Sequence, residues 1–461
     1  MLDRRGFIAA LVAAVPTAAG ARGLDMRPPR KPMPEPGDVV AASGLQGKIA
    51  FALLDGRQPA ALGKAALAMA PASTMKVITA LFALDRLGPG HRFGTRLIRA
   101  GDMLILAGGG DPVLSSDDLA RLAATLASSG SPPPRRFAVW GGALPSIAQI
   151  APEQAVHLAY NPTISGMILN FNRVHLGWTR VGVNHQLSVE ARATGQSLRA
   201  YTISAMPATH ADLFTYRHDI EREYWTISRA AMGPSGSRWL PVRLPELYAA
   251  DVFQTLCRAR GLVLPQPEVI AHLPQGEVIA RHDSPPLRTL VHDMLLYSTN
   301  ITAETLGLHA SGANTLPTSA DAMSGWLGGL GKGMRLADHS GLSEASRVSA
   351  FGLASVLAGP GRDLGLGPLL RTDPLDEDLG PGQADHRVSA KTGTLNFVSN
   401  LAGYVTTRSG REGAFAILCT DEARRATSIG EELPDDVSTW THAAKSLQRD
   451  LIGAFAGRLG G

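Results

Sequence analysis

The sequence predicts an α+β protein whose main domain is interrupted by a long, β-rich insertion. Segments with apolar residues at helical spacing alternate with segments in which every second residue is apolar. Glycine (50) and proline (31) are abundant, which is typical of a fold with many turns. With 461 residues, the chain is long enough for roughly two or three domains and a large core.

The chain begins with a segment typical of an export signal. Arg4 and Arg5 precede a short apolar run over 7–15, and small residues at 19–21 offer a cleavage point. The paired arginines resemble a twin-arginine signal, although an ordinary secretory signal fits nearly as well. We predict a signal peptide over residues 1–21 and a periplasmic location. Because the apolar run is shorter than the roughly 20 residues of a spanning helix, no transmembrane segment is expected in the mature chain, and peripheral membrane contact stays open.

The first elements of the main domain are predicted close to the N-terminus. A strand is expected over 47–55, where apolar residues alternate, and a second extended piece over 65–70. A helix is expected to start at Ser73 and to end before Gly88. Ser73 would therefore lie at the positive end of a helix dipole.

The long stretch between Ser73 and Ser298 indicates an insertion. Its first part mixes strands with a helix, and after a proline-rich linker it becomes mostly extended, which indicates one β-rich domain nested in another. The expected strands cover residues 95–99, 103–107, 167–174, 186–191 and 198–206, and the expected helices cover 116–128, 244–260 and 287–297.

The C-terminal part is predicted to complete the sheet of the main domain. Lys391 begins an alternating run, and strands over 399–407 and 413–419 flank a turn, as in a β-hairpin. A helix over 437–455 would pack on this sheet.

Composition argues against several classes of function. Lysine and arginine number 44 and aspartate and glutamate 40, so the net charge of +4 is too small to indicate a nucleic-acid partner. The 13 histidines form no His-Glu-x-x-His pattern, and no metal site is predicted. Cys257 and Cys419 are the only cysteines. Two buried thiols are expected, and a disulfide between them is the alternative that the sequence leaves open.

Three short motifs occur in an order that indicates a catalytic site. They are Ser73-Thr74-Met75-Lys76, Ser298-Thr299-Asn300 and Lys391-Thr392-Gly393-Thr394. Singly, each has an ordinary structural explanation as a helix cap, a loop between helices or an exposed strand. Together, at the start of a helix, between two helices and on a strand, they form the signature of an active-site serine acyl-transfer enzyme.

The first motif supplies a nucleophile and its base. Ser73 and Lys76 are three residues apart on a helix, so their side chains lie on one face and can meet. A lysine normally carries a proton, with a pKa of about 10.4, and becomes a base only where desolvation or another cation disfavours its charge. Lys391 is the candidate for that second cation.

The other motifs complete the predicted site. Ser298 is the candidate proton relay to the leaving group, and Asn300 is expected to hold the substrate's peptide amide and to fix Lys76. The backbone N–H groups of Ser73 and Thr394 are the predicted oxyanion hole. Asn396, two residues along the strand from Thr394, is expected on the same face, against the substrate's side chain. The residues predicted to bind the terminal carboxylate and line the strand beside the nucleophile are Lys391, Thr392, Gly393 and Thr394.

These motifs and four further segments resemble the class C low-molecular-mass penicillin-binding proteins, which are D-alanyl-D-alanine carboxypeptidases and endopeptidases. The resemblance is specific in the catalytic third and loose over about 130–241. The further segments are Gly109-Gly110-Asp111-Pro112, Ala303-Glu304-Thr305-Leu306, Ser340-Gly341-Leu342-Ser343 and Asn400-Leu401-Ala402-Gly403-Tyr404.

The resemblance implies a penicillin-binding-protein/serine β-lactamase-like transpeptidase domain, an antiparallel sheet with helices, with two inserted accessory domains. The expected ranges are 22–88 and 285–461 for the catalytic domain, 89–160 and 235–284 for one accessory domain, and 161–234 for the nested one. It also implies action on peptidoglycan peptides without a cofactor or metal, and acylation of Ser73 by β-lactam antibiotics. A serine β-lactamase or esterase and a non-catalytic cell-wall or β-lactam-binding protein are the alternatives. The balance of carboxypeptidase and endopeptidase activity stays open.

Overall fold

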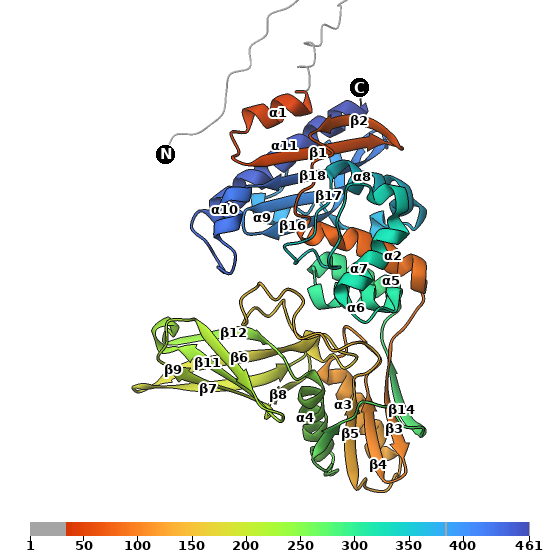
Figure 1. Ribbon diagram of the computed structural model, residues 1–461, viewed down its shortest axis with the longest axis vertical. Coiled ribbons are helices and arrows are strands. Elements are labelled where there is room, and N and C mark those ends of the chain that lie inside the picture. Colours follow the sequence, from red (N-terminus) through yellow and green to blue (C-terminus); the bar gives the residue numbers. More distant parts are fainter. Residues whose placement is uncertain (1–33, 383–384, 461) are drawn as a thin grey trace, which may run out of the picture. The chain divides into compact units, whose positions relative to one another are not determined.

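The computed structural model describes residues 34–382 and 385–460 (Figure 1). The predicted signal peptide over 1–21 lies outside the described residues. Within the described ranges, no helix is both long and apolar enough to cross a membrane.

A six-stranded antiparallel sheet forms the main domain, in the order β15-β16-β17-β18-β1-β2. Pairing of β1 with β18 joins an early strand of the described chain to a late one, from Lys48 opposite Thr420 to Asp55 opposite Gly413. The strands are β1 (Lys48–Asp55), β2 (Gln58–Gly63), β15 (Arg371–Thr372), β16 (His386–Leu395), β17 (Val398–Thr407) and β18 (Glu412–Thr420). The predicted β-hairpin is confirmed, whereas the extended piece predicted over 65–70 forms only an isolated β-bridge, between Met69 and Val348, and the second strand lies earlier, at β2.

Helices cover both faces of this sheet (Figure 1). Alternate residues of β1 enter two different cores, as the two-residue period of a strand requires. Ala50, Ala52 and Leu54 pack with helix α2, and Ile49 and Phe51 are among those that pack with helix α11. The helices of this domain are α1 (Pro36–Ala42), α2 (Met75–Leu87), α5 (Leu287–Tyr297), α6 (Asn300–Ser311), α7 (Leu316–Leu327), α8 (Ala350–Val356), α9 (Asp376–Leu379), α10 (Glu422–Thr427) and α11 (Val437–Gly460).

The inserted part contains three smaller sheets, with the strand orders β13-β5-β4-β3-β14, β12-β6-β7-β8 and β10-β11-β9. The first includes β3 (Gly94–Ala100), β4 (Met103–Ala107), β5 (Arg136–Trp140), β13 (Pro267–Val269) and β14 (Glu277–Asp283), beside α3 (Ser116–Ser128) and α4 (Pro245–Arg258). The others are built from β6 (Arg173–Val181), β7 (Asn184–Arg192), β8 (Ser197–Arg199), β9 (Ile203–Ala208), β10 (Phe214–His218), β11 (Glu223–Ser228) and β12 (Ser235–Pro241). The expected ranges of the accessory domains stay a prediction.

Two strand predictions in the insertion are wrong. The segment 167–174 is not one strand, because the backbone of Asn170, Phe171 and Asn172 is left-handed, and β6 begins only at Arg173. The segment 198–206 is divided between β8 and β9, which belong to different sheets. Alternation of apolar residues does not reveal where a chain leaves one sheet for another.

The two cysteines are free and fully buried. Cys257 lies in the core around α4, and Cys419 lies on β18 in the core that faces α11. The disulfide that the sequence left open is therefore absent, and burial raises the pKa of each thiol to about 12.

Candidate active site

Ser73 lies in a 3-10 turn over Ala72–Thr74 that runs directly into α2. The α-helix itself therefore begins at Met75, two residues later than predicted. The turn is tightly packed: Ala72 has a left-handed backbone (φ 45°), and a Cβ atom on Gly341 would lie 1.9 Å from its carbonyl oxygen. Gly341, itself at φ 80°, is thus the residue that lets a remote loop lie against the nucleophile turn.

Lys76 is fully buried one helical turn beyond Ser73. Its Nζ donates to Ser73 Oγ (2.9 Å), Asn300 Oδ1 (2.8 Å) and the carbonyl oxygen of Ser340 (2.9 Å). Desolvation lowers the pKa of Lys76 from 10.5 to about 8, against the opposing charges of Glu304 and Asp338. Burial, rather than a second cation, is therefore the main cause of the shift.

Two buried carboxyl groups, Glu304 and Asp338, support this arrangement, and neither was predicted to have a role. Glu304 accepts the N–H groups of His339 (3.0 Å) and Ser340 (2.8 Å), and the carbonyl of Ser340 accepts from Lys76. Asp338 accepts the N–H of Ser343 (2.9 Å). Burial raises the pKa of both carboxyls, and the neighbouring Asp338 adds to the rise at Glu304. In the sequence, the signal that could have pointed to Glu304 is its position one helical turn beyond Asn300, as the only acid of that helix.

The second motif occupies the junction between α5 and α6. Ser298 has a left-handed backbone (φ 60°, ψ 34°), and Asn300 is the first residue of α6. The Asn300 carboxamide is engaged at both ends: its oxygen accepts from Lys76, and its Nδ2 donates to the carbonyl oxygen of Tyr160 (3.1 Å). The predicted hold on a substrate amide would require that second hydrogen bond to open.

The third motif lies near the end of β16, against the nucleophile turn. A Cβ atom on Gly393 would lie 2.9 Å from the Thr74 nitrogen and 3.0 Å from the Ser73 nitrogen, so the missing side chain permits this approach. Lys391 is buried and donates to the carbonyl oxygen of Thr392 (2.8 Å). Desolvation, reinforced by the charge of Lys76, lowers the pKa of Lys391 well below its usual value.

Asn400 on β17 holds the nucleophile turn from the sheet side. Its Nδ2 donates to the carbonyl oxygens of Ala70 (2.8 Å) and Pro71 (2.9 Å), and its Oδ1 accepts the N–H of Cys419 (3.1 Å). All of these groups are buried, so the side chain pairs polar atoms that water cannot reach. It therefore links β17 and β18 to the segment that carries Ser73.

Asn396 differs from its prediction. Strand β16 ends at Leu395, so Asn396 lies in the turn before β17 and does not continue the strand face of Thr394. Its Nδ2 donates to the carbonyl oxygen of Glu431 (2.9 Å). It nevertheless lines the pocket described next.

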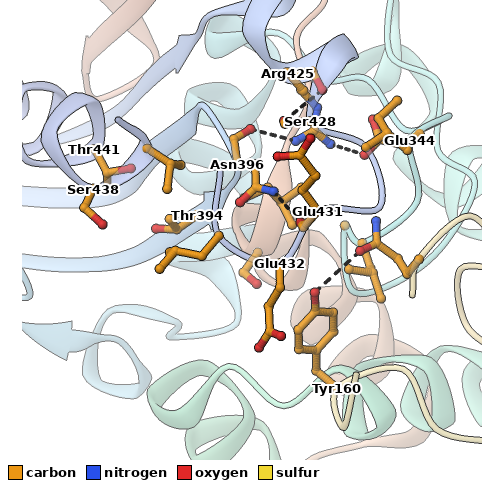
Figure 2. Close-up of a pocket in the computed structure, with 18 of the residues that line it drawn as sticks. Tyr160, Glu344, Thr394, Asn396, Arg425, Ser428, Glu431, Glu432, Ser438 and Thr441 are labelled. Carbon is orange, nitrogen blue, oxygen red and sulfur yellow. Dashed lines mark hydrogen bonds and ion pairs between the residues drawn. The ribbon is translucent and has the colours of Figure 1, made fainter. Parts of the chain in front are cut away.

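A pocket of about 590 Å³ opens beside Ser73 (Figure 2). Ser298, Asn300, Thr394 and Asn396 line it with Ser73, whereas Lys76, Lys391, Thr392 and Gly393 are not among its lining residues. Figure 2 shows Tyr160, from the inserted part, on the side of the pocket away from Arg425. The wall that the sequence analysis missed includes Gln154, Tyr160, Glu344, Asp378, Arg425, Glu431, Glu432, Thr441, His442 and Lys445.

Comparison with known proteins identifies the family. A family model described as D-Ala-D-Ala carboxypeptidase 3 (S13) matches residues 49–433. The chain belongs to this family. Among curated relatives, a D-alanyl-D-alanine carboxypeptidase of Actinomadura sp. is 29% identical over 392 residues, covering 76% of this chain and 72% of the relative. The resemblance noted in the sequence is confirmed.

Solved structures of other proteins share the fold of this chain. Penicillin binding protein 4 (dacB) of Haemophilus influenzae aligns with a TM-score of 0.73 and 21% identity, over 91% of this chain and 100% of that one. The same protein complexed with a β-lactam aligns with a TM-score of 0.69 and 21% identity, over 91% and 99%. The predicted α+β class, with a penicillin-binding-protein-like domain and additional inserted sheets, is confirmed.

Proposed function

We propose that this chain is a serine-type D-alanyl-D-alanine carboxypeptidase that trims peptidoglycan stem peptides through an acyl-enzyme on Ser73. The observation that carries the proposal is the 2.9 Å contact between Lys76 Nζ and Ser73 Oγ, in a site where burial lowers the lysine pKa to about 8. A lysine with this pKa is neutral often enough at physiological pH to accept the proton of the hydroxyl. Membership of the S13 family supports the substrate class.

The first half-reaction forms the acyl-enzyme. Ser73 Oγ attacks the carbonyl carbon of the penultimate D-alanine while its proton passes to Lys76. The carbonyl oxygen becomes an oxyanion, for which we assign the backbone N–H groups of Ser73 and Thr394 as donors. The C–N bond to the terminal D-alanine then breaks, and Ser298 relays the proton from Lys76 to the leaving nitrogen. The products are an ester on Ser73 and free D-alanine.

The other motif residues bind the substrate or support the reacting groups. Asn300 fixes Lys76 through its carboxamide oxygen. Asn396 is assigned to the substrate's side chain because it lines the pocket. Binding of the terminal carboxylate is assigned to Lys391, Thr392 and Thr394, with Gly393 allowing their strand to approach Ser73.

The second half-reaction releases the shortened peptide. Water attacks the ester carbonyl, neutral Lys76 accepts a proton from the water, and a proton returns to Ser73 Oγ as the ester bond breaks. A D-alanyl cross-link that reaches Ser73 gives the same ester, so the proposal includes endopeptidase activity. A β-lactam also acylates Ser73, but its leaving nitrogen stays attached and hinders the water. The β-lactam complex of the Haemophilus influenzae protein supports this inhibition.

D-alanine release tests the proposed reaction. Purified protein is incubated with diacetyl-lysyl-D-alanyl-D-alanine, and free D-alanine is measured for wild type, Ser73→Ala and Lys76→Met. We expect turnover by wild type and none by either variant. The contrary result is a folded wild type that releases no D-alanine from this peptide or from pentapeptide muropeptides and cleaves no cross-linked muropeptide dimer. That result would favour a non-catalytic binding protein.

Mass spectrometry after incubation with benzylpenicillin tests the acyl-enzyme. One adduct is expected, and peptide digestion should map it to Ser73. Turnover of nitrocefin is expected to be slow, since the ring nitrogen stays in the site. Rapid nitrocefin turnover would instead indicate a serine β-lactamase.

We also propose that the protein acts in the periplasm, after removal of residues 1–21. The substrate class supports this location, because peptidoglycan lies outside the cytoplasmic membrane. Fractionation of cells that carry the full chain, with and without Arg4→Lys/Arg5→Lys, tests both the location and the twin-arginine route. Export that survives this double substitution would point to the general secretory route.

A further inference from the structure

Arg243, between β12 and α4 of the inserted part, holds a segment that reaches the active site. Its Nη1 donates to the carbonyl oxygens of Ala148 and Asn161 (2.8 Å each), and its Nη2 donates to that of Val156 (2.8 Å). One guanidinium thus gathers three carbonyls spread along residues 148–161. The planar fork of arginine suits this role, since its donors have a fixed geometry.

The 148–161 segment contains no helix or strand, so few backbone ladder bonds hold its shape. Within the segment, Asn161 donates to the carbonyl of Ala151 (2.8 Å) and accepts its N–H (2.9 Å). Two side chains also reach distant residues: Glu153 accepts the N–H of Glu344 (2.9 Å), and His157 lies 3.4 Å from Glu432. Two of its side chains, Gln154 and Tyr160, line the pocket beside Ser73. The guanidinium therefore fixes a part of the pocket wall that has no regular structure.

Arg243 is itself held by a buried acid. Glu223 is only 1% exposed, and its Oε1 accepts the backbone N–H groups of Arg243 (3.0 Å) and Leu244 (2.9 Å). The charges of the two side chains also attract each other. These contacts hold Arg243 in one conformation, unlike an arginine on an open surface.

The segment ends at a catalytic-site hydrogen bond. The carbonyl oxygen of Tyr160, adjacent to the clamped carbonyl of Asn161, accepts from Asn300 Nδ2 (3.1 Å). A carbonyl can only accept, so it turns the amide nitrogen of Asn300 toward itself and leaves the amide oxygen facing Lys76 (2.8 Å). Without this contact the carboxamide can rotate and present its nitrogen to a lysine that is also a donor.

We infer that Arg243 is a positioning residue for the reaction, which acts through Tyr160 and Asn300 to keep an acceptor on Lys76. The inference rests on the proposed function. It makes the inserted part a component of the catalytic hydrogen-bond network rather than an appended domain.

The test compares Arg243→Ala with Arg222→Ala as a matched control. Arg222 also lies in the inserted part and donates to one carbonyl, that of Tyr201, but Tyr201 does not line the pocket. The rate of acylation by benzylpenicillin is measured by stopped-flow and intact mass, with circular dichroism to confirm folding. Arg243→Ala should acylate at least about tenfold more slowly, because misplacement of a catalytic group is costly. Arg222→Ala should match wild type.

Two readouts separate positioning from a general loss of structure. Millimolar guanidinium or methylguanidinium should restore acylation in Arg243→Ala and leave Arg222→Ala unchanged. The pH midpoint of acylation should also fall in Arg243→Ala, since losing an acceptor disfavours the charged form of Lys76. In an Asn300→Ala background, the Arg243 substitution should cause no further loss of rate.

Several outcomes would overturn the inference. Folded Arg243→Ala that acylates at the wild-type rate with an unchanged pH midpoint excludes a positioning role. If that variant does not fold, Arg243→Lys replaces it: lysine keeps the charge but not the fork, so an intermediate rate is expected and a wild-type rate counts against the inference. Wild type that benzylpenicillin does not acylate would instead refute the proposed function.

Discussion

The lowered pKa of Lys76 predicts how acylation should depend on pH. Burial lowers this pKa from 10.5 to about 8. If neutral Lys76 is the base, the acylation rate follows its neutral fraction, which at pH 7 is about 9%, compared with about 0.03% at the ordinary value. The lowered pKa therefore raises the fraction of neutral Lys76 at pH 7 about 300-fold.

The assay is the rate of acylation by benzylpenicillin, measured by stopped-flow between pH 6 and pH 9.5. The rate should rise about tenfold per pH unit at the acid end and level off above about pH 8, as the lysine loses its proton. Glu304→Gln should move the midpoint to lower pH, because the Glu304 charge opposes the shift at Lys76. A flat profile, or a rate that still rises steeply at pH 9.5, would refute Lys76 as the base.

Three further predictions concern packing around the site. Gly393→Ala should slow acylation by about 10- to 100-fold, since its Cβ atom would lie 2.9 to 3.0 Å from backbone of the nucleophile turn; a wild-type rate would show that β16 need not lie so close to Ser73. Asn400→Ala should lower the free energy of unfolding by about 3 kcal/mol, since it leaves buried backbone groups unpaired, and urea denaturation measures this. Cys257 and Cys419 should react with a thiol reagent only after denaturation, and no thiol signal in unfolded, unreduced protein would contradict their free state.

The three motifs were predictable because the secondary structure around each one is encoded by neighbouring residues. Each motif carries its own helix start, helix junction or strand in a few adjacent residues, and the contact of Ser73 with Lys76 follows from their three-residue spacing across the 3-10 turn and the start of α2. Asn396 shows the limit of such reasoning, because the strand ends one residue before it, at a turn that alternation does not reveal.

The supporting residues could not be predicted in the same way. Glu304 and Asp338 meet near Lys76 only because α6 and a later loop pack together, and Asn400 reaches the nucleophile turn only through the order of strands in the sheet. Arg243 is an ordinary arginine in the sequence, and its role appears only when three carbonyls converge on it. Such contacts join residues far apart in the chain, which periodicity does not address.

The sequence by itself determined the family, the candidate groups of the site and most of the helices and strands, because these depend on short motifs and on local patterns of apolar residues. Tertiary structure decided the state of those groups. The desolvation that lowers the pKa of Lys76, the orientation of Asn300 and the shape of the pocket all come from distant segments packed around the same few atoms, since burial and hydrogen-bond geometry are properties of the folded chain.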